Sequence, residues 1–242
     1  MKISESVVLV TGGNRGIGKA FVAEVLKRGA AKVYVASRDA ASIISSEDPR
    51  VIPMVLDVTD QAQIADATEV ASDVTLLINN AGFAAFEGAI SSPDLSNARE
   101  EMEVNYFGPL ALSRAFKSTL AASGGGAIVN MLSMLSLISL PAAATYSASK
   151  AAGLSVTRSI RAELAAQGTL VVGVLAVQAE TSMGAKLPSP RLTPEEVVAD
   201  ALDAVEGGTN DEVFAGTLTK NAYQAFSADP KGFQAKMLTR LP

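Results

Sequence analysis

The sequence predicts an α/β fold, with one mostly parallel, seven-stranded sheet doubly wound by helices on both of its faces. Short apolar runs alternate with helical patterns along the whole chain, which is typical of parallel sheets. A glycine-rich turn joins the first of these runs to the first helix. Hydrophobic residues make up 48% of the 242 residues and aromatic residues only 5%. That composition suits strands buried between closely packed helices.

The apolar run at residues 7–10 predicts the first strand, and the pattern after it predicts a helix that ends near Gly29. Further strands are expected at residues 32–36, 51–56, 74–78, 127–132, 170–177 and 212–215. Further helices are expected after a cap at Thr59 and Asp60, from about residue 95, through Asn105, and from Tyr146 to about residue 167. The chain contains no linker, low-complexity tract or repeat, so we expect one domain covering residues 1–242.

Composition excludes several classes of function. The chain has no cysteine and no histidine, which excludes disulfides, Ser-His-Asp catalysis and ordinary zinc hydrolysis; no metal site is expected. A net charge of −5 argues against a nucleic-acid partner. No apolar run approaches the length of a membrane span, so we expect no membrane partner and a cytoplasmic location. Acid–base work near neutral pH therefore falls to Tyr, Lys, Asp or Glu.

The turn after the first strand reads T-G-G-N-R-G-I-G from Thr11 to Gly18. A glycine turn between a strand and a helix directs backbone N–H groups at a phosphate. The second strand is expected to end at Ser37 and Arg38, where an NAD-binding protein carries a carboxylate for the ribose hydroxyl. A hydroxyl beside a guanidinium suits a 2′-phosphate instead, and Arg15 offers a second guanidinium. The expected coenzyme is NADP(H), with NAD(H) less favoured.

The chemistry is expected between Ser133 and Lys150, where Tyr146 lies thirteen positions after the serine and four before the lysine. The second gap places Tyr146 and Lys150 on one helical face. Ionising a tyrosine near pH 7 requires roughly 4 kcal/mol. An ammonium about 4 Å away supplies ~4 kcal/mol at an effective dielectric constant of about 20. We therefore expect Lys150 to lower the pKa of Tyr146, which would transfer the proton while Ser133 holds the reacting oxygen.

Together these motifs resemble the short-chain dehydrogenase/reductase family. The glycine turn, D-V at 57–58, N-N-A-G at 79–82, Asn105, Ser133 and Y-S-A-S-K at 146–150 follow the order and spacing of that family over roughly residues 5 to 216. The resemblance implies a Rossmann-type fold and a nicotinamide-dependent oxidoreductase. In it Ser133 orients the carbonyl or alcohol, Tyr146 is the acid–base, Lys150 also binds the nicotinamide ribose, and Asn105 holds a water in a proton relay.

The resemblance also implies the coenzyme contacts. The residues that match are, for pyrophosphate and ribose, Gly12, Asn14, Arg15, Gly16, Ile17 and Gly18; for adenine and adenosine, Asp57, Val58, Asn80 and Ala81; and for the carboxamide, Thr181. Ser37 and Arg38 occupy the position that selects NADP. A lid over the substrate is expected at about residues 178–192. Family members often form homotetramers or homodimers through the two long helices around the fifth strand.

Two positions depart from the family pattern. Members usually carry Pro-Gly after the sixth strand, where this chain has Ala176 and Val177. Valine disfavours backbone angles that glycine adopts, so the turn beneath the nicotinamide is expected to differ. In addition, Leu132 precedes Ser133, where members often have a second serine.

The leading hypothesis is an NADP(H)-dependent carbonyl reductase or secondary-alcohol dehydrogenase that acts on a small-molecule hydrophobic or aromatic ketone. The expected apolar walls of the substrate site are Phe83, Ala84, Leu135, Leu137, Met183 and Leu187. One alternative is a 3-oxoacyl-carrier-protein reductase, which needs a basic docking patch that Lys186 and Arg191 would supply. Another is a non-catalytic NADP-binding regulatory protein. Turnover of ketones with NADPH separates the enzymes from the regulator.

Overall fold

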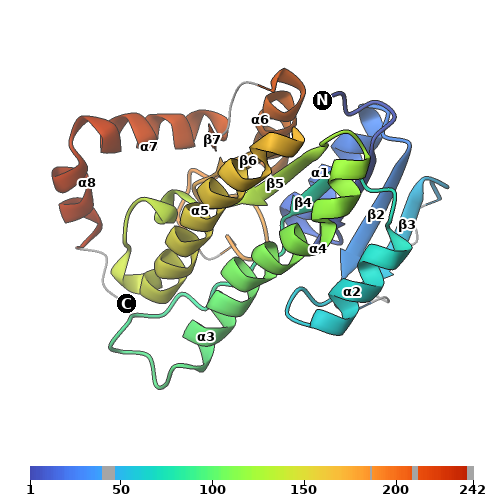
Figure 1. The fold of residues 1–242 in the computed structure, drawn as a ribbon. Helices are drawn as coiled ribbons and strands as arrows, with labels where there is room; N and C mark the ends of the chain where they lie inside the picture. The colour runs from blue at the N-terminus through green and yellow to red at the C-terminus, as the bar shows by residue number, and fades with distance from the viewer. Residues whose placement is uncertain (40–46, 186, 209–211, 239–242) are drawn as a thin grey trace.

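The computed structural model describes residues 1–39, 47–185, 187–208 and 212–238. Seven strands form one sheet in the order β3-β2-β1-β4-β5-β6-β7, and each neighbouring pair of these strands is parallel (Figure 1). The strands are β1 (Val7–Thr11), β2 (Lys32–Ser37), β3 (Val51–Val55), β4 (Leu76–Asn79), β5 (Ala127–Met131), β6 (Leu170–Leu175) and β7 (Glu212–Phe214). The predicted doubly wound α/β fold is confirmed.

Helices cover both faces of the sheet, with α2, α4 and α5 on one side and α1 and α6 on the other (Figure 1). The α-helices are α1 (Gly16–Lys27), α2 (Gln61–Val70), α3 (Ser96–Met102), α4 (Gly108–Ala122), α5 (Ala144–Leu164), α6 (Pro194–Gly207), α7 (Gly216–Ala228) and α8 (Pro230–Met237). Short turns are the π-helix η2 (Glu103–Phe107) and the 3₁₀ helices η3 (Met134–Ser136), η4 (Pro141–Ala143) and η5 (Ala165–Gln167). Within the described ranges no helix is long and apolar enough to cross a membrane.

The core consists of two apolar layers separated by the sheet. Because successive side chains of a strand point to opposite faces, Val8 and Val10 of β1 pack toward α1 and α6, whereas Leu9 packs toward α2 and α4. Phe21 and Phe116 are the largest fully buried side chains of the two layers. Burial on both faces is what the β-branched runs of the sequence predicted.

Several boundaries differ from the predictions because backbone groups distant in sequence determine them. α5 begins at Ala144, two residues before the predicted Tyr146, because the Glu87 carbonyl accepts the Ala144 N–H at 3.0 Å. α6 was not predicted, although a capping box of Thr193 with Glu196 marks its start. The cap at Asp60 is confirmed, since its carboxylate accepts two N–H groups of α2.

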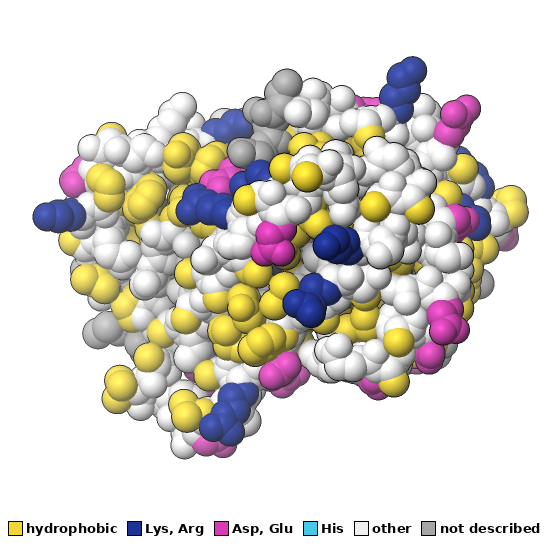
Figure 2. All heavy atoms as spheres, in the orientation of Figure 1, with side chains coloured by type: hydrophobic (Ala, Val, Ile, Leu, Met, Phe, Trp, Pro, Cys, Tyr) yellow, Lys and Arg dark blue, Asp and Glu magenta, His cyan; other side chains and the backbone are white. Residues whose placement is uncertain are grey.

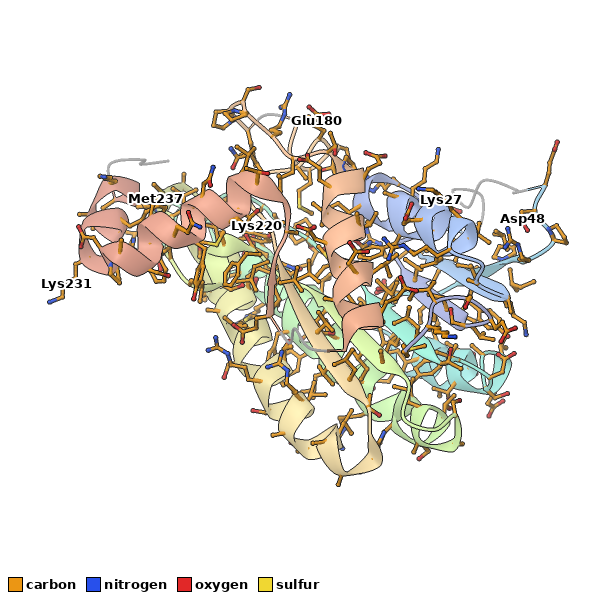
Figure 3. The ribbon with its side chains drawn as sticks, turned by 90° about the horizontal axis from the view of Figure 1, so that it is seen from above. Lys27, Asp48, Glu180, Lys220, Lys231 and Met237 are labelled. Carbon is orange, nitrogen blue, oxygen red and sulfur yellow. The ribbon has the colours of Figure 1, made fainter. Side chains whose placement is uncertain are left out.

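The C-terminal helices α7 and α8 were also not predicted. Seen from above they extend to one side of the sheet, with Lys231 and Met237 at the far end (Figure 3). α8 has no buried residue. It is tied to the segment after β5 by Gln234, whose side chain pairs with both backbone polar groups of Ser139 at 2.9 and 2.8 Å.

The turn before β5 contains three glycines in the left-handed region, with φ of 82° at Gly124, 109° at Gly125 and 61° at Gly126. Their surroundings differ. A Cβ on Gly124 would meet nothing within 4 Å, whereas a Cβ on Gly125 would collide with the backbone oxygen of Gly168. The turn therefore provides a matched pair of positions for separating backbone strain from crowding.

We expect Gly124→Ala to lower the free energy of unfolding by about 1–2 kcal/mol, the cost of left-handed alanine. Gly125→Ala should lower it by roughly 1–3 kcal/mol more, because the added methyl group also displaces the Gly168 carbonyl. Urea denaturation of the two variants measures the difference. Equal losses would show that the β5 turn relaxes around the added carbon.

Candidate active site

Parallel pairing brings the predicted site residues to one edge of the sheet, the edge at which the strands end. β1 ends at the glycine turn, β2 at Ser37, and β4 just before Asn80. β5 ends two residues before Ser133, which is the N-cap of η3. Helix α5 returns to this edge with Tyr146 in its first turn.

Ser133 and Tyr146 are linked by a side-chain hydrogen bond. Ser133 is 8% exposed, and its hydroxyl oxygen also accepts the Leu135 N–H at 3.1 Å, which fixes the side chain at the start of η3. Burial raises the pKa of Tyr146 to about 12; the hydrogen bond to Ser133 acts in the opposite direction, and the charge of Glu101 adds to the rise. Tyr146 is therefore a neutral phenol at physiological pH, held against a second hydroxyl.

Lys150 is 5% exposed and lies one turn after Tyr146 on α5, as the spacing predicted. Its ammonium donates to the Met131 carbonyl at 2.9 Å and lies 5.8 Å from the centroid of the Tyr146 ring. Burial lowers the pKa of Lys150 to about 8. The pKa of Tyr146 is raised rather than lowered in this structure, because burial is the largest influence on the phenol. A lowering of that pKa by Lys150 stays a prediction.

Asn105 lies in η2, a π-helical turn of the kind often found at functional sites. Its amide oxygen accepts the Phe83 N–H at 3.0 Å, and its amide nitrogen donates to the Phe83 carbonyl at 2.8 Å and to Ser149 at 3.0 Å. Both amide donors are thereby occupied. The side chain holds the segment after β4 in place, and a water held by Asn105 stays a prediction.

The glycine turn has the form required for a phosphate. Gly12 and Gly16 have φ of 63° and 52°, and a Cβ on Gly18 would collide with the Gly12 carbonyl. Helix α1 begins at Gly16 after Arg15 without a side-chain cap. Its first N–H groups therefore have no intrahelical partner, and such groups bind anions. The residues present fit a dinucleotide pyrophosphate.

Asn80 supports this turn rather than extending into it. Its amide donates to the carbonyls of Thr11 at 2.9 Å and Gly12 at 3.2 Å. The backbone N–H groups of Asn80 and Ala81 both donate to the Thr11 hydroxyl, at 3.0 and 3.1 Å. The tip of β4 thus fixes the tip of β1, and an adenosine contact by Asn80 or Ala81 stays a prediction.

The candidate coenzyme-selecting residues lie at the end of β2. Ser37 is 8% exposed, whereas Arg38 and Arg15 are exposed. Neither arginine forms an ion pair with any other described residue. At the end of β3, the Asp57 carboxylate accepts from the backbone and hydroxyl of Thr59 at 2.9 and 2.8 Å, and Val58 is buried. Adenine contacts by Asp57 and Val58 stay predictions.

The segment predicted as a lid is linked at its base, where Gln178 and Glu180 exchange backbone hydrogen bonds with Leu192 at 3.0 and 2.8 Å. Thr181 lies against the glycine turn, since a Cβ on Gly16 would come within 3.1 Å of its methyl group. A carboxamide contact by Thr181 stays a prediction.

Ala176 and Val177, which replace the usual Pro-Gly, fit without strain. Val177 is not among the residues with positive φ. Its N–H donates to the buried Thr219 hydroxyl of α7 at 3.1 Å, and the Ala176 carbonyl accepts the Met134 N–H at 2.9 Å. The turn is therefore held by α7 and η3, an arrangement that involves a helix absent from the predictions.

Sequence reasoning missed Glu101 of α3, which is fully buried. One carboxylate oxygen accepts the Ala85 N–H at 2.9 Å, and the other has no hydrogen-bond partner. Its position four residues before Asn105, on the helical face that buries the amide, was the available signal.

Comparisons with known proteins agree with this geometry. The model of the short chain dehydrogenase family matches residues 6–191. A short chain dehydrogenase from Burkholderia cenocepacia J2315, solved in complex with NADP, is 42% identical and superposes with a TM-score of 0.93 over 98% of this chain and 99% of that one.

Two curated relatives match with lower identity. Cis-4-hydroxycyclohexanecarboxylate dehydrogenase from Sinomonas cyclohexanicum is 30% identical over 219 residues, which cover 82% of this chain and 88% of that protein. Short chain dehydrogenase tazN from Aspergillus terreus is 34% identical over 170 residues, which cover 64% of this chain. The match spans only 37% of the length of the second relative.

The raised pKa of Tyr146 is measurable. Because burial favours the neutral phenol, the phenolate of Tyr146 should appear only as the pH approaches about 12. The near-ultraviolet phenolate absorbance of the wild-type protein and of Tyr146→Phe should therefore be equal up to a pH of about 10, the ordinary pKa of tyrosine. Circular dichroism checks that both proteins stay folded. A difference between them near neutral pH would show that Lys150 controls the phenol after all.

Proposed function

Because the chain belongs to the short-chain dehydrogenase/reductase family, we propose that it interconverts a ketone and a secondary alcohol with NADP(H) as coenzyme. The observation that carries this proposal is the hydrogen-bonded pair of the buried Ser133 and the half-buried Tyr146, at the edge of the sheet to which the glycine turn also belongs. A neutral phenol beside a hydroxyl provides a proton donor and an orienting group for one carbonyl oxygen.

In the reductive direction the bound coenzyme supplies the hydride. Ser133 donates a hydrogen bond to the carbonyl oxygen, and Tyr146, protonated because of its raised pKa, gives its proton to that oxygen. Lys150 is a cation below a pH of about 8, and its charge stabilises the phenolate that remains after the transfer. In the oxidative direction Tyr146 must first lose its proton, which burial opposes.

Two observations support NADP(H) over NAD(H). The Burkholderia cenocepacia relative was solved with NADP. The end of β2 presents the exposed guanidinium of Arg38, and the exposed Arg15 lies beside the first turn of α1. A 2′-phosphate would form charge-assisted hydrogen bonds with such groups, whereas NAD offers only a hydroxyl there.

Apolar walls support a hydrophobic small-molecule substrate. Leu135 and Leu137 follow Ser133 and are half-buried, and Met183 is 39% exposed in the segment over the site. For the carrier-protein alternative, one guanidinium nitrogen of Arg191 already donates to the carbonyls of Gly184, Ala185 and Leu187, at 3.0 to 3.2 Å. The other basic residue of that alternative, Lys186, lies outside the described residues. A small ketone therefore fits the site better than an acidic carrier.

We also propose self-association through α4 and α5. Figure 2 shows hydrophobic side chains gathered over these two helices. Phe107, the last residue of η2 directly before α4, is 45% exposed. On α5 the exposed residues Ala148, Ala151 and Ser155 are small, so a second copy can approach the helix closely. We also propose that the protein is located in the cytoplasm.

The proposed function predicts NADPH oxidation in the presence of a panel of ketones, and a preference for NADPH over NADH. One charge-assisted phosphate contact contributes about 1.5–3 kcal/mol, so the ratio of the two kcat/KM values should be roughly ten to a hundred. Replacing Ser37 by Asp together with Arg38 by Leu should reduce or invert the ratio, mainly through the KM for coenzyme.

Both results come from one assay at fixed low salt. Tight NADPH binding without turnover of any ketone would instead support the regulatory protein. Turnover with equal kcat/KM for the two coenzymes would support the proposed oxidoreductase activity but would contradict the proposed contact of Arg38 with the 2′-phosphate.

A further inference from the structure

One residue near the site has a backbone conformation that its side chain disfavours. Phe86 has a φ of 57°, in the left-handed region, and among the described non-glycine residues only Glu5 shares a positive φ. A bulky residue in this region is an outlier. Such strain persists only where the surroundings impose it, and it concentrates at functional sites.

The surroundings of Phe86 do impose it, since both of its neighbours are held. On one side the Ala85 N–H donates to Glu101 at 2.9 Å. On the other, the Glu87 carbonyl accepts the N–H of Ala144, the first residue of α5, at 3.0 Å. The Glu87 carboxylate is itself fixed by side-chain hydrogen bonds within residues 92–97, at 2.6 and 2.9 Å.

The burial of Glu101, whose carboxylate accepts the Ala85 N–H, costs the folded state free energy. The side chain is completely buried, and one of its oxygens has no hydrogen-bond partner. Burying a carboxylate with an unpaired oxygen is unfavourable, and such groups are rare in folded proteins. A leucine would fill this space without that cost, but it would leave the Ala85 N–H without an acceptor.

The hydrogen bonds that hold Ala85 and Glu87 also fix the ring of Phe86 beside that of Tyr146. Phe86 lies with its ring centroid 6.0 Å from that of Tyr146, at an interplanar angle of 45°. This separation is within the range of favourable aromatic pairs. Phe86 is only half-buried, so part of its ring is not covered by protein. The ring of Phe86 therefore lies beside the phenol that acts as proton donor in the proposed function.

We propose that Phe86 is a specificity-determining residue, held by Glu101 and Glu87 as a wall beside Tyr146 against which an aryl substituent of the ketone packs. The preferred substrates are then aryl alkyl ketones and the corresponding benzylic alcohols. This inference rests on the proposed function and names its substrate class. Glu101 is a positioning residue in it, because it acts through the backbone of Ala85.

The test compares kcat/KM for acetophenone and for 2-butanone with saturating NADPH. Phe86→Ala should lower the acetophenone-to-butanone ratio on the order of tenfold, the preference that one aromatic contact provides. The change should appear in the KM for acetophenone, with the KM for NADPH unchanged. Phe86→Tyr keeps the ring and should keep the ratio. Ile90→Ala, which removes a 96% exposed apolar side chain from the same loop, is the matched control and should also keep it.

The role of Glu101 has its own pair of variants. Glu101→Gln retains an acceptor for the Ala85 N–H and should keep the wild-type ratio, whereas Glu101→Leu loses the acceptor and should lower the ratio as Phe86→Ala does. A folded Glu101→Leu protein with the wild-type ratio would overturn the positioning role. If Glu101→Leu does not fold, Glu101→Gln tests the role alone, and a Glu101→Gln protein with a ratio as low as that of Phe86→Ala would overturn the account in which Glu101 acts as an acceptor for the Ala85 N–H.

The two proposals fail in different ways. A wild-type protein that turns over neither ketone overturns the proposed function, and this inference with it. A wild-type protein that turns over both, with an unchanged ratio in Phe86→Ala, overturns the inference alone. Phe86→Gly gives an independent measure of the strain, since glycine adopts positive φ freely and its variant should melt at a higher temperature than Phe86→Ala. The opposite order would show that Phe86 is not strained.

Discussion

The arrangement of the site depends on parallel pairing of β1, β4, β5 and β6, because parallel strands must all end at the same edge of their sheet. That constraint places the glycine turn, Asn80 and Ser133 together although they are distant in sequence. Hydrogen bonds between the strand tips then lock them, as when the amide of Asn80 holds the carbonyl of Gly12. The topology therefore brings the proposed phosphate site and the proposed proton donor to one edge.

Burial, rather than attraction between charges, sets the protonation of the site. The ammonium of Lys150 donates to a backbone carbonyl, and the phenol of the half-buried Tyr146 lies next to Ser133. Desolvation favours the neutral form of each group, so it raises the pKa of the phenol and lowers that of the amine. Tyr146 is therefore protonated at physiological pH, which is the state that the proposed reduction requires of its proton donor.

Local patterns were predictable from the sequence, and contacts between distant segments were not. The glycine turn, the cap at Asp60 and the four-residue gap from Tyr146 to Lys150 involve neighbours along the chain. The contacts of Glu101 with Ala85 and of Thr219 with Val177 join different elements, and no periodicity reveals them. The direction in which the pKa of Tyr146 shifts was not predicted for the same reason. The charge of a neighbouring residue can be read from a sequence, whereas the depth of burial cannot.

The most direct test of Tyr146 as the proton donor is the turnover of Tyr146→Phe, measured with NADPH and a ketone that the wild-type protein reduces, together with NADPH binding. Because the substitution removes only a phenolic hydroxyl, we expect NADPH binding to stay nearly unchanged while kcat falls by about two to four orders of magnitude, the usual contribution of general acid catalysis. A Tyr146→Phe protein that binds NADPH and keeps a kcat within about tenfold of wild type would contradict the assignment of Tyr146 as the proton donor.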